Sequence, residues 1–309
     1  MSRGSTIKQQ APERLTLLRP MITRRYEFTV EHDKCCGCEI CATVCPREAI
    51  KMLPSDLVAG RLARKPRVDI DPTLCSFCGE CVAMCPTHAM AMTVNGQPEI
   101  PVIKGEAFPY LIRTHKVSES VCEATTDVAY LENCPAGAIS AELSRDAEGQ
   151  VTAVKNVAVD KRACINCTRC MEEGPRGAFT VVKPYEGRVF LKTSLCPTGC
   201  QACADVCPTN TITYDGDKVA IDQRFCLFCG ACQKVCPVAG AVRIVRTGFV
   251  HTPVQSGAWA AALDKLVSFL EVSREYGIKS QQKRRQVVIN GLRVQGPAAD
   301  GEAAKEGKS

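Results

Sequence analysis

Three cysteine runs of identical spacing constrain this chain more than any other feature of its sequence. Each run reads C-x2-C-x2-C-x3-C and is followed by proline. This spacing is typical of bacterial-type [4Fe–4S] ferredoxins, in which three cysteines of a run bind one cluster and the fourth binds the other cluster of a pair. The runs are Cys35, Cys38, Cys41 and Cys45; Cys75, Cys78, Cys81 and Cys85; and Cys226, Cys229, Cys232 and Cys236.

Two further regions carry altered versions of this pattern. One run has an additional residue between its first two cysteines, in a loop CPTGC whose Pro197 and Gly199 favour a turn. We expect this bulged loop still to present its sulfur atoms. In the middle of the chain, a complete triplet is followed by Gly174-Pro175 instead of Cys-Pro. The altered run is Cys196, Cys200, Cys203 and Cys207, and the triplet is Cys164, Cys167 and Cys170.

The fourth ligand of the middle triplet is predicted upstream, at Cys134. Cys134-Pro135 resembles the end of a run whose three earlier positions are not cysteines. Cys134 precedes Cys164 by 30 residues, as Cys45 precedes Cys75. The upstream run lacks its first three cysteines and the downstream run lacks its fourth. These four positions would all bind the same cluster of a pair, so we predict that this region keeps only the other cluster of that pair. The positions without cysteine are Ala124, Asp127, Tyr130 and Gly174.

The cysteines can therefore supply four ligands to each of five [4Fe–4S] clusters. Exchange of the fourth ligand between paired runs sets the assignment. We predict cluster 1 from Cys35, Cys38, Cys41 and Cys85; cluster 2 from Cys75, Cys78, Cys81 and Cys45; cluster 3 from Cys164, Cys167, Cys170 and Cys134; cluster 4 from Cys196, Cys200, Cys203 and Cys236; and cluster 5 from Cys226, Cys229, Cys232 and Cys207.

Two of the 22 cysteines, Cys36 and Cys122, remain outside this assignment. Cys36 breaks the spacing of its run, and we interpret it as a packed or weakly reactive thiol. Cys122 lies near the missing cluster and is interpreted as a core residue or a relic. Zinc is the competing metal, because C-x2-C pairs also build Zn(Cys)4 sites. The third cysteine of each run and the terminal Cys-Pro favour iron–sulfur clusters.

Composition and charge agree with metal chemistry rather than disulfides. Aromatic residues make up only 5% of the chain, which leaves little large side-chain area for a core. We find no signal-peptide pattern and no run near the ~20 apolar residues of a membrane span, and so expect a cytoplasmic protein with reduced thiols and no membrane contact. We interpret the net charge of +6 as compensation for anionic clusters, because the basic residues are scattered; nucleic-acid binding is not expected.

Short β-branched segments alternate with the cysteine runs and predict an α+β fold of tandem bacterial-type 2[4Fe–4S] ferredoxin-like modules, a polyferredoxin. The modules are 26–105 with two clusters, 106–190 with one and 191–250 with two. An arm at 1–25 and a C-terminal helix and tail at 251–309 flank them. Strands are predicted at Tyr26–Val30, Arg67–Ile70, Ala91–Val94, Asn156–Val159, Phe179–Val182, Val189–Lys192, Thr211–Tyr214, Lys218–Ile221 and Val242–Val245, and short helices at Glu39–Val44, Glu80–Met84, Cys203–Val206 and Ala231–Val235.

The segment Ser256–Tyr276 is predicted to be a longer helix with one apolar face. That face either covers the core of this chain or docks on a partner subunit. Val287–Val294 is a further predicted strand, and the polar end 295–309 is expected to be disordered. The apolar stripe consists of Trp259, Leu263, Leu266, Val267 and Leu270.

No catalytic motif accompanies the cysteine runs. The four histidines are scattered, and we find no triad pattern and no nucleotide-binding loop. Clusters with four cysteine ligands leave no open iron for substrate, so we predict a non-catalytic subunit that passes single electrons. An interaction scaffold that the clusters merely stabilise is the alternative.

The chain resembles the polyferredoxin subunit of archaeal formylmethanofuran dehydrogenase, a tungsten or molybdenum enzyme, over residues 21–270. The bulged CPTGC loop and the segment HTPVQSGAW are the most specific parts of this resemblance. It also includes TRRYEFTVEHDKCCGCEICATVCPREAI, CSFCGECVAMCPTHAMAMTVNGQPEI and VVKPYEGRVFLKTSLCPTGCQACADVCPTN.

The resemblance implies electron conduction between a low-potential redox partner and an enzyme that interconverts CO2 and formylmethanofuran. It further implies partner subunits of that enzyme complex, including a small ferredoxin subunit. A polyferredoxin that serves a hydrogenase or a heterodisulfide reductase is the alternative within the same class.

Overall fold

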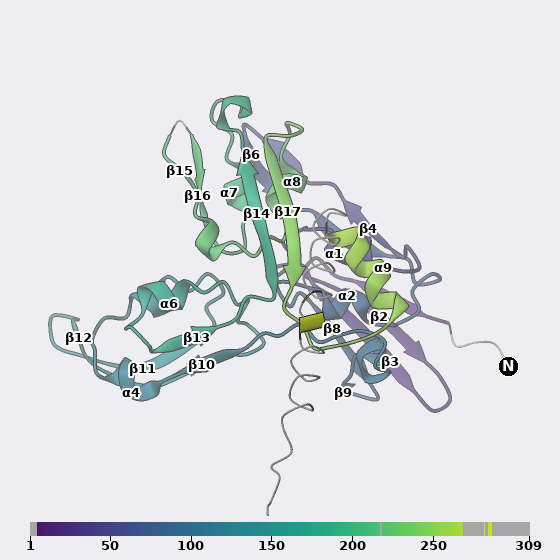
Figure 1. The fold of residues 1–309 in the computed structure, drawn as a ribbon, viewed down its shortest axis with the longest axis horizontal. Coiled ribbons are helices and arrows are strands. Elements are labelled where there is room, and N and C mark those ends of the chain that lie inside the picture. Colours follow the sequence, from purple (N-terminus) through teal and green to yellow (C-terminus); the bar gives the residue numbers. More distant parts are fainter. Residues whose placement is uncertain (1–4, 217, 268–280, 282–283, 286–309) are drawn as a thin grey trace, which may run out of the picture. The chain divides into compact units, whose positions relative to one another are not determined.

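The computed structural model describes residues 5–216, 218–267, 281 and 284–285. The chain divides into two units, Met1–Ser268 and Phe269–Ser309, and every strand and helix named below lies in the first. Figure 1 shows the fold as a ribbon coloured along the sequence, with strands and helices labelled. The nine strands and four short helices predicted between residues 26 and 245 are confirmed, with ends shifted by up to a few residues.

The first module combines an outer antiparallel sheet, an inner hairpin and an inserted hairpin. The outer sheet contains β1 (Ile7–Gln10), β2 (Arg14–Pro20), β3 (Arg25–Glu31), β8 (Met90–Val94) and β9 (Gln97–Pro98), in that order. The remaining elements are the inner hairpin β4 (Ile50–Leu53) and β7 (Arg67–Ile70), the inserted hairpin β5 (Asp56–Val58) and β6 (Arg61–Arg64), and the helices α1 (Ile40–Val44), α2 (Glu80–Ala83) and α3 (Pro101–Lys104).

Residues 1–25, predicted as an arm, contain two strands of this outer sheet. Leu15 pairs with Val30 and Leu17 pairs with Phe28, and all four side chains are buried. Alternation along β2 places both leucines on the face that covers the core of the module. The described part of this segment therefore belongs to the first module and is not a separate arm.

The second and third modules repeat the outer strand pair and the inner hairpin. In the second module β10 (His115–Val117) pairs with β13 (Phe179–Val181), and β11 (Ile139–Arg145) pairs with β12 (Val151–Val159). In the third module β14 (Tyr185–Leu191) pairs with β17 (Val242–Phe249), and β15 (Ile212–Tyr214) pairs with β16 (Val219–Ile221). The helices are α4 (Glu119–Glu123), α5 (Ala129–Glu132), α6 (Arg169–Glu173), α7 (Ala202–Val206) and α8 (Ala231–Val235), with 3-10 turns at Thr193–Leu195 and Gln223–Phe225.

Strand β14 crosses the predicted boundary between the second and third modules. The boundary expected after residue 190 falls inside this strand. Because β14 pairs along its length with β17, it belongs to the third module (Figure 1). The third module therefore begins near Tyr185, whose hydroxyl also donates to the carbonyl oxygen of Met84 in the first module.

Helix α9 (Gly257–Leu266) occupies the described part of the predicted C-terminal helix. Trp259, Leu263 and Leu266 are buried, and the helix packs against α1 of the first module. The ring of Trp259 meets that of Phe108 edge-on, with 5.1 Å between centroids. The described part of the apolar stripe therefore covers the chain's own core, which is the first of the two alternatives. Residues 268–276 and 287–309, with Leu270, lie outside the described residues.

The Trp259→Ala variant is expected to lower the free energy of unfolding by about 3–5 kcal/mol, because it empties a buried aromatic site. Phe190→Ala provides the control, since Phe190 is half exposed on β14 and should cost much less. Denaturant unfolding followed by the visible absorbance of the clusters measures both. Equal losses in the two variants would contradict the packing of α9 on the core.

Candidate iron–sulfur centres

The first cysteine of each regular run is followed by a loop that aims a backbone N–H at its sulfur. Phe228, two residues after Cys226, has a φ of 51° and donates its N–H to Cys226 Sγ over 3.3 Å. The residue at the same position in three other loops also has a left-handed backbone: Gly37, Phe77 and Asn166 have φ of 68°, 57° and 58°. Their N–H groups donate to Cys35, Cys75 and Cys164, respectively.

A second left-handed residue follows the second cysteine of each regular run and precedes a short helix. Alternation of left- and right-handed residues makes successive N–H groups converge, an arrangement that binds anions and iron–sulfur clusters. The helix then carries the third cysteine. These residues are Glu39, Gly79, Thr168 and Gly230, with φ of 62°, 90°, 71° and 93°, before α1, α2, α6 and α8.

The fourth cysteines also accept backbone hydrogen bonds. Ala49 N donates to Cys45 Sγ and Ala138 N donates to Cys134 Sγ, each over 3.3 Å. Cys134 thus has the local geometry of an intact fourth ligand, although its own run has lost its first three cysteines. Hydrogen bonds of this kind favour the thiolate form that a cluster requires.

In the first module, the fourth cysteine of each run lies with the triplet of the other run. Burial raises the pKa of Cys35 to about 12, and the charges of Cys38 and Cys85 act in the same direction. The pKa of Cys81 is raised well above its usual value, by burial and then by Cys78, Cys75 and Cys45. The predicted quartets of clusters 1 and 2 are therefore brought together.

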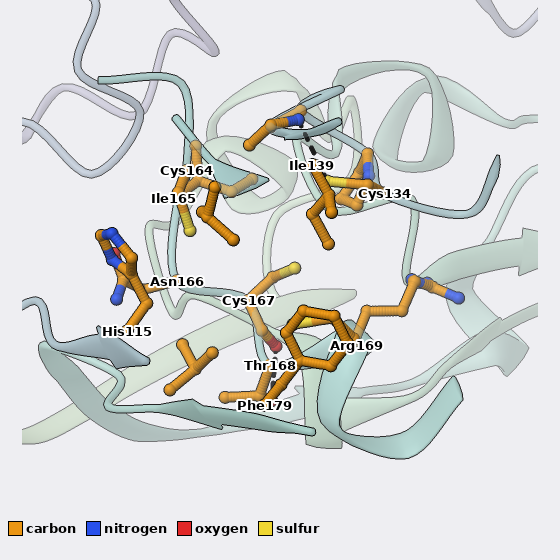
Figure 2. A pocket seen from close by; sticks show the side chains of 16 residues that line it. His115, Cys134, Ile139, Cys164, Ile165, Asn166, Cys167, Thr168, Arg169 and Phe179 are labelled. Carbon is orange, nitrogen blue, oxygen red and sulfur yellow. Dashed lines mark hydrogen bonds between the residues drawn. The ribbon is translucent and has the colours of Figure 1, made fainter. Parts of the chain in front are cut away.

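In the second module, one cavity is lined by all four cysteines predicted for cluster 3. Figure 2 shows the sulfur atoms of Cys134, Cys164 and Cys167 around the same space, beside the ring of Phe179. Burial raises the pKa of Cys170 to about 12, with the charges of Cys167, Cys164 and Cys134 adding to the effect. Cys134 therefore lies with the triplet, as its 30-residue spacing indicated.

In the third module, the altered run still exchanges its fourth cysteine with the regular run. Burial, and then Cys236 and Cys200, raise the pKa of Cys196. Burial raises the pKa of Cys226 to about 12, with Cys229 and Cys207 adding to it. The assignment of each quartet to a bound cluster remains a prediction.

The inserted hairpin of the first module supports the bulged loop of the altered run. Gly60 O accepts a hydrogen bond from Gln201 N, and a Cβ at Gly60 would lie 2.8 Å from Cys200 Cα. Arg61 forms an ion pair with Asp205 on α7 over 2.8 Å. The loop thus rests on another module, a contact that the sequence pattern does not indicate.

A hydrophobic core fills the position of the missing cluster. Tyr130, at the third lost cysteine position, packs against Phe179 with 5.1 Å between ring centroids. Cys122 is fully buried in the same core. The interpretation of Cys122 as a packed core thiol is therefore confirmed. A Cβ at Gly174 would lie 2.6 Å from Cys170 O and 2.8 Å from the ring of Phe179, so aromatic packing occupies the space of the lost fourth cysteine.

The Gly174→Ala variant is expected to destabilise the second module by about 1–3 kcal/mol, because the added methyl group overlaps Cys170 O and Phe179. Gly257→Ala is the matched control, since a Cβ there meets nothing within 4 Å. Chemical denaturation measures both variants. A stable Gly174→Ala protein would show that the space is open.

Polar side chains connect the quartets of different modules. Arg113 donates to Cys85 O over 2.6 Å and also acts on the pKa of Cys164. Lys183 donates to Cys226 O over 3.3 Å, and burial lowers its pKa while the thiols of Cys226 and Cys167 oppose this. Sequence reasoning missed both residues, because nothing in their spacing separates them from other surface cations.

The donor set fits [4Fe–4S] clusters: cysteine thiols from paired runs, several of them with backbone N–H donors at their sulfurs, are held in largely apolar surroundings. Within residues 5–216 and 218–267, no three or more His, Cys, Asp or Glu side chains converge tightly enough to hold one mononuclear ion. Thiolates around a four-iron core stand farther apart than the ligands of one ion. In the same described part of the chain, no helix is both long and apolar enough to cross a bilayer.

Comparisons with known proteins find ferredoxin sequences. A 4Fe-4S dicluster domain model matches residues 34–89 and 195–240. A ferredoxin 7Fe of Hydrogenibacillus schlegelii is 45% identical over 38 residues, 12% of this chain; this chain spans about half (49%) of its length. An uncharacterized ferredoxin of Methanocaldococcus jannaschii is 34% identical over 56 residues, which cover 18% of this chain and 73% of that protein.

One solved structure is similar over most of the chain. It is a chain of the formate dehydrogenase–heterodisulfide reductase–formylmethanofuran dehydrogenase complex from Methanospirillum hungatei, with a TM-score of 0.72 and 25% identity. The match covers 86% of this chain and 92% of that chain. The resemblance to a subunit of such a complex is thereby confirmed.

Proposed function

Because the chain belongs to the [4Fe–4S] ferredoxin family, we propose that it is a polyferredoxin subunit that conducts single electrons through five clusters. A [4Fe–4S] cluster supplies one-electron chemistry when bound. The chain's own residues hold the thiolates in place, aim N–H groups at the sulfurs and exclude water. Full cysteine ligation leaves no coordination position for substrate, which supports a non-catalytic role.

The adjacency of the quartets is the observation that carries this proposal. In the first module the charge of Cys81, which belongs to the other quartet, raises the pKa of Cys41. In the third module the charge of Cys203, which also belongs to the other quartet, raises the pKa of Cys232. Arg113 and Lys183 lie between quartets of different modules. A scaffold that clusters only stabilise would not require its quartets to adjoin one another.

We further propose that the enzyme served is a formylmethanofuran dehydrogenase, with the external partner a low-potential donor or acceptor. The partners are then other subunits of that complex, including a small ferredoxin subunit. The similar chain from Methanospirillum hungatei supports this choice, as does the bulged CPTGC loop. That complex also includes heterodisulfide reductase, so a polyferredoxin serving that enzyme is the second candidate. We place the protein in the cytoplasm, where thiols stay reduced.

Anaerobic purification from the native source tests both parts of this proposal. Iron and acid-labile sulfide should each approach about 20 per chain if five clusters are bound. Subunits of formylmethanofuran dehydrogenase should co-purify with the chain. Iron near about 24 would mean a sixth site that includes Cys36 or Cys122. Co-purification with hydrogenase or heterodisulfide reductase subunits alone would favour the second candidate.

A further inference from the structure

Threonine hydroxyls lie at the sulfur atoms of two predicted fourth ligands. Cys85 Sγ is 3.8 Å from Thr87 Oγ1, and Cys207 Sγ is 3.4 Å from Thr209 Oγ1. Each of these threonines follows its cysteine by two residues, in the sequence Cys-Pro-Thr. Thr211 Oγ1 is a second hydroxyl near Cys207 Sγ, at 3.8 Å. Cys85 is predicted to bind cluster 1 and Cys207 to bind cluster 5, so each of these clusters has a ligand sulfur with a hydroxyl beside it.

These hydroxyls are buried, and cysteine sulfur is their hydrogen-bond partner. Thr87, Thr209 and Thr211 are 6%, 1% and 2% exposed. Among the described residues, the hydrogen bonds of all three hydroxyls go to Cys85 or Cys207. A buried hydroxyl that loses its partner costs free energy, so these bonds should persist when the clusters are bound. A cysteine bound to a cluster is a thiolate, which accepts a hydrogen bond and cannot donate one. The hydroxyls are therefore the donors.

The other three fourth cysteines have no hydroxyl at the corresponding position, which is occupied by Arg47, Ala136 or Val238. Cys236 Sγ instead lies 3.3 Å from the carbonyl oxygen of Val238. A carbonyl oxygen is only an acceptor, so it cannot form a hydrogen bond to a thiolate. Cys236 is predicted to bind cluster 4. The two clusters of the third module thus differ in their surroundings, with hydroxyl donors at Cys207 and a carbonyl oxygen at Cys236.

We propose that Thr87 and Thr209 are positioning residues whose hydroxyls give clusters 1 and 5 higher reduction potentials than the other three clusters. The proposal rests on the function and the ligand assignment proposed above. Hydrogen bonds to the sulfurs are one of the factors that set the reduction potential of a cluster. Reduction adds one electron and makes the cluster more negative, so a donor stabilises the reduced form and raises the potential. The hydroxyls keep their protons, and no bond breaks.

The two clusters concerned adjoin one junction between modules. A single cavity is lined by Cys35 and Thr87 of the first module and by Cys207 and Pro208 of the third. Cys35 is a predicted ligand of cluster 1, and Cys207 of cluster 5. Electrons that enter the chain therefore occupy the clusters on the two sides of this junction first, and clusters 2, 3 and 4 are reduced at lower potentials.

The test uses the full chain with its clusters and compares valine with serine at each position. Valine has the shape of threonine without its hydroxyl. Thr87→Val and Thr209→Val should each keep the iron content of the wild type, and each should shift one cluster to a lower midpoint potential in an EPR-monitored titration. The double valine variant should shift two clusters. Thr87→Ser and Thr209→Ser keep the donor and should keep the midpoint potentials of the wild type.

Thr43→Val is the matched control, because Thr43 lies on α1 between two cysteines of the first run. Its hydroxyl donates to Glu39 O over 3.0 Å rather than to sulfur. This variant should leave every midpoint potential unchanged. The proposal is overturned if the valine variants keep the wild-type potentials, or if the serine variants shift as far as the valine variants. Loss of iron from the valine variants would make the hydroxyls structural and would overturn it as well. Failure of the proposed function would look different, since the wild type itself would then show no low-potential signals.

Discussion

Replacing Cys134 with serine is expected to lower the iron content of the purified chain by about four atoms, from about 20 to about 16. Cys134 lies 30 residues before its triplet in the sequence, yet it lines the same cavity as Cys164, Cys167 and Cys170. It is the only predicted fourth ligand for that cluster. A serine hydroxyl is a weaker ligand for iron than a thiolate, so the cluster should be lost or become labile during purification.

Cys122→Ser is the control, because Cys122 lies in the same module and is fully buried. Its side chain packs with Tyr130 and Phe179 where the other cluster is missing. This variant should keep the iron content of the wild type, although it is expected to be less stable. If Cys122→Ser loses iron and Cys134→Ser does not, the ligand assignment of the second module is wrong.

Removal of all clusters is expected to abolish cooperative folding. The helices that carry the third cysteines have only four or five residues, too few for a helix to be stable in water by itself. Predicted cluster ligands also form part of the hydrophobic cores of the first and third modules. The binding energy of the clusters is therefore part of the folding energy.

Circular dichroism of chain prepared anaerobically with an iron chelator and an oxidant tests this expectation. The treated chain should lack a sharp thermal transition, whereas the untreated chain should show one that coincides with loss of visible absorbance. A cooperative transition in the cluster-free chain would mean that side-chain packing alone supports the fold.

Acid is expected to accelerate this loss of clusters. Burial raises the pKa of Cys35, Cys170 and Cys226 to about 12, so these thiols are protonated at neutral pH when no cluster is bound. Bound ligands are thiolates, and cluster release therefore takes up protons. Lower pH favours the released state, and the rate of absorbance loss under chelator should rise as pH falls.

Features within single repeats could be predicted from the sequence, because they depend on local spacing. The short helices and the strands between runs recur with the cysteine pattern. The matched losses at Tyr130 and Gly174 also indicated a missing cluster before any packing was visible. These features depend on interactions between residues that are close in sequence.

Features that depend on packing between distant segments could not be predicted. Strand β2 pairs with β3, and its Arg19 donates to Cys75 O over 2.7 Å, but neither contact has a signal in the residues 1–25. The apolar stripe around Trp259 indicates that one face of α9 is buried, but it does not indicate which segment packs against that face. The hydrogen bond from Gln201 N to Gly60 O joins segments that are far apart in sequence, and it depends on how the modules pack.

Potentiometric EPR titration of the cluster-loaded chain tests the central claim most directly. The account predicts that about five spins per chain appear as the potential falls through the low range typical of such clusters. It also predicts that the signals broaden through magnetic interaction, since quartets adjoin within and between modules. Clusters that are present by iron and sulfide analysis but remain EPR-silent and unreduced throughout the titration would contradict electron conduction and leave only a structural role.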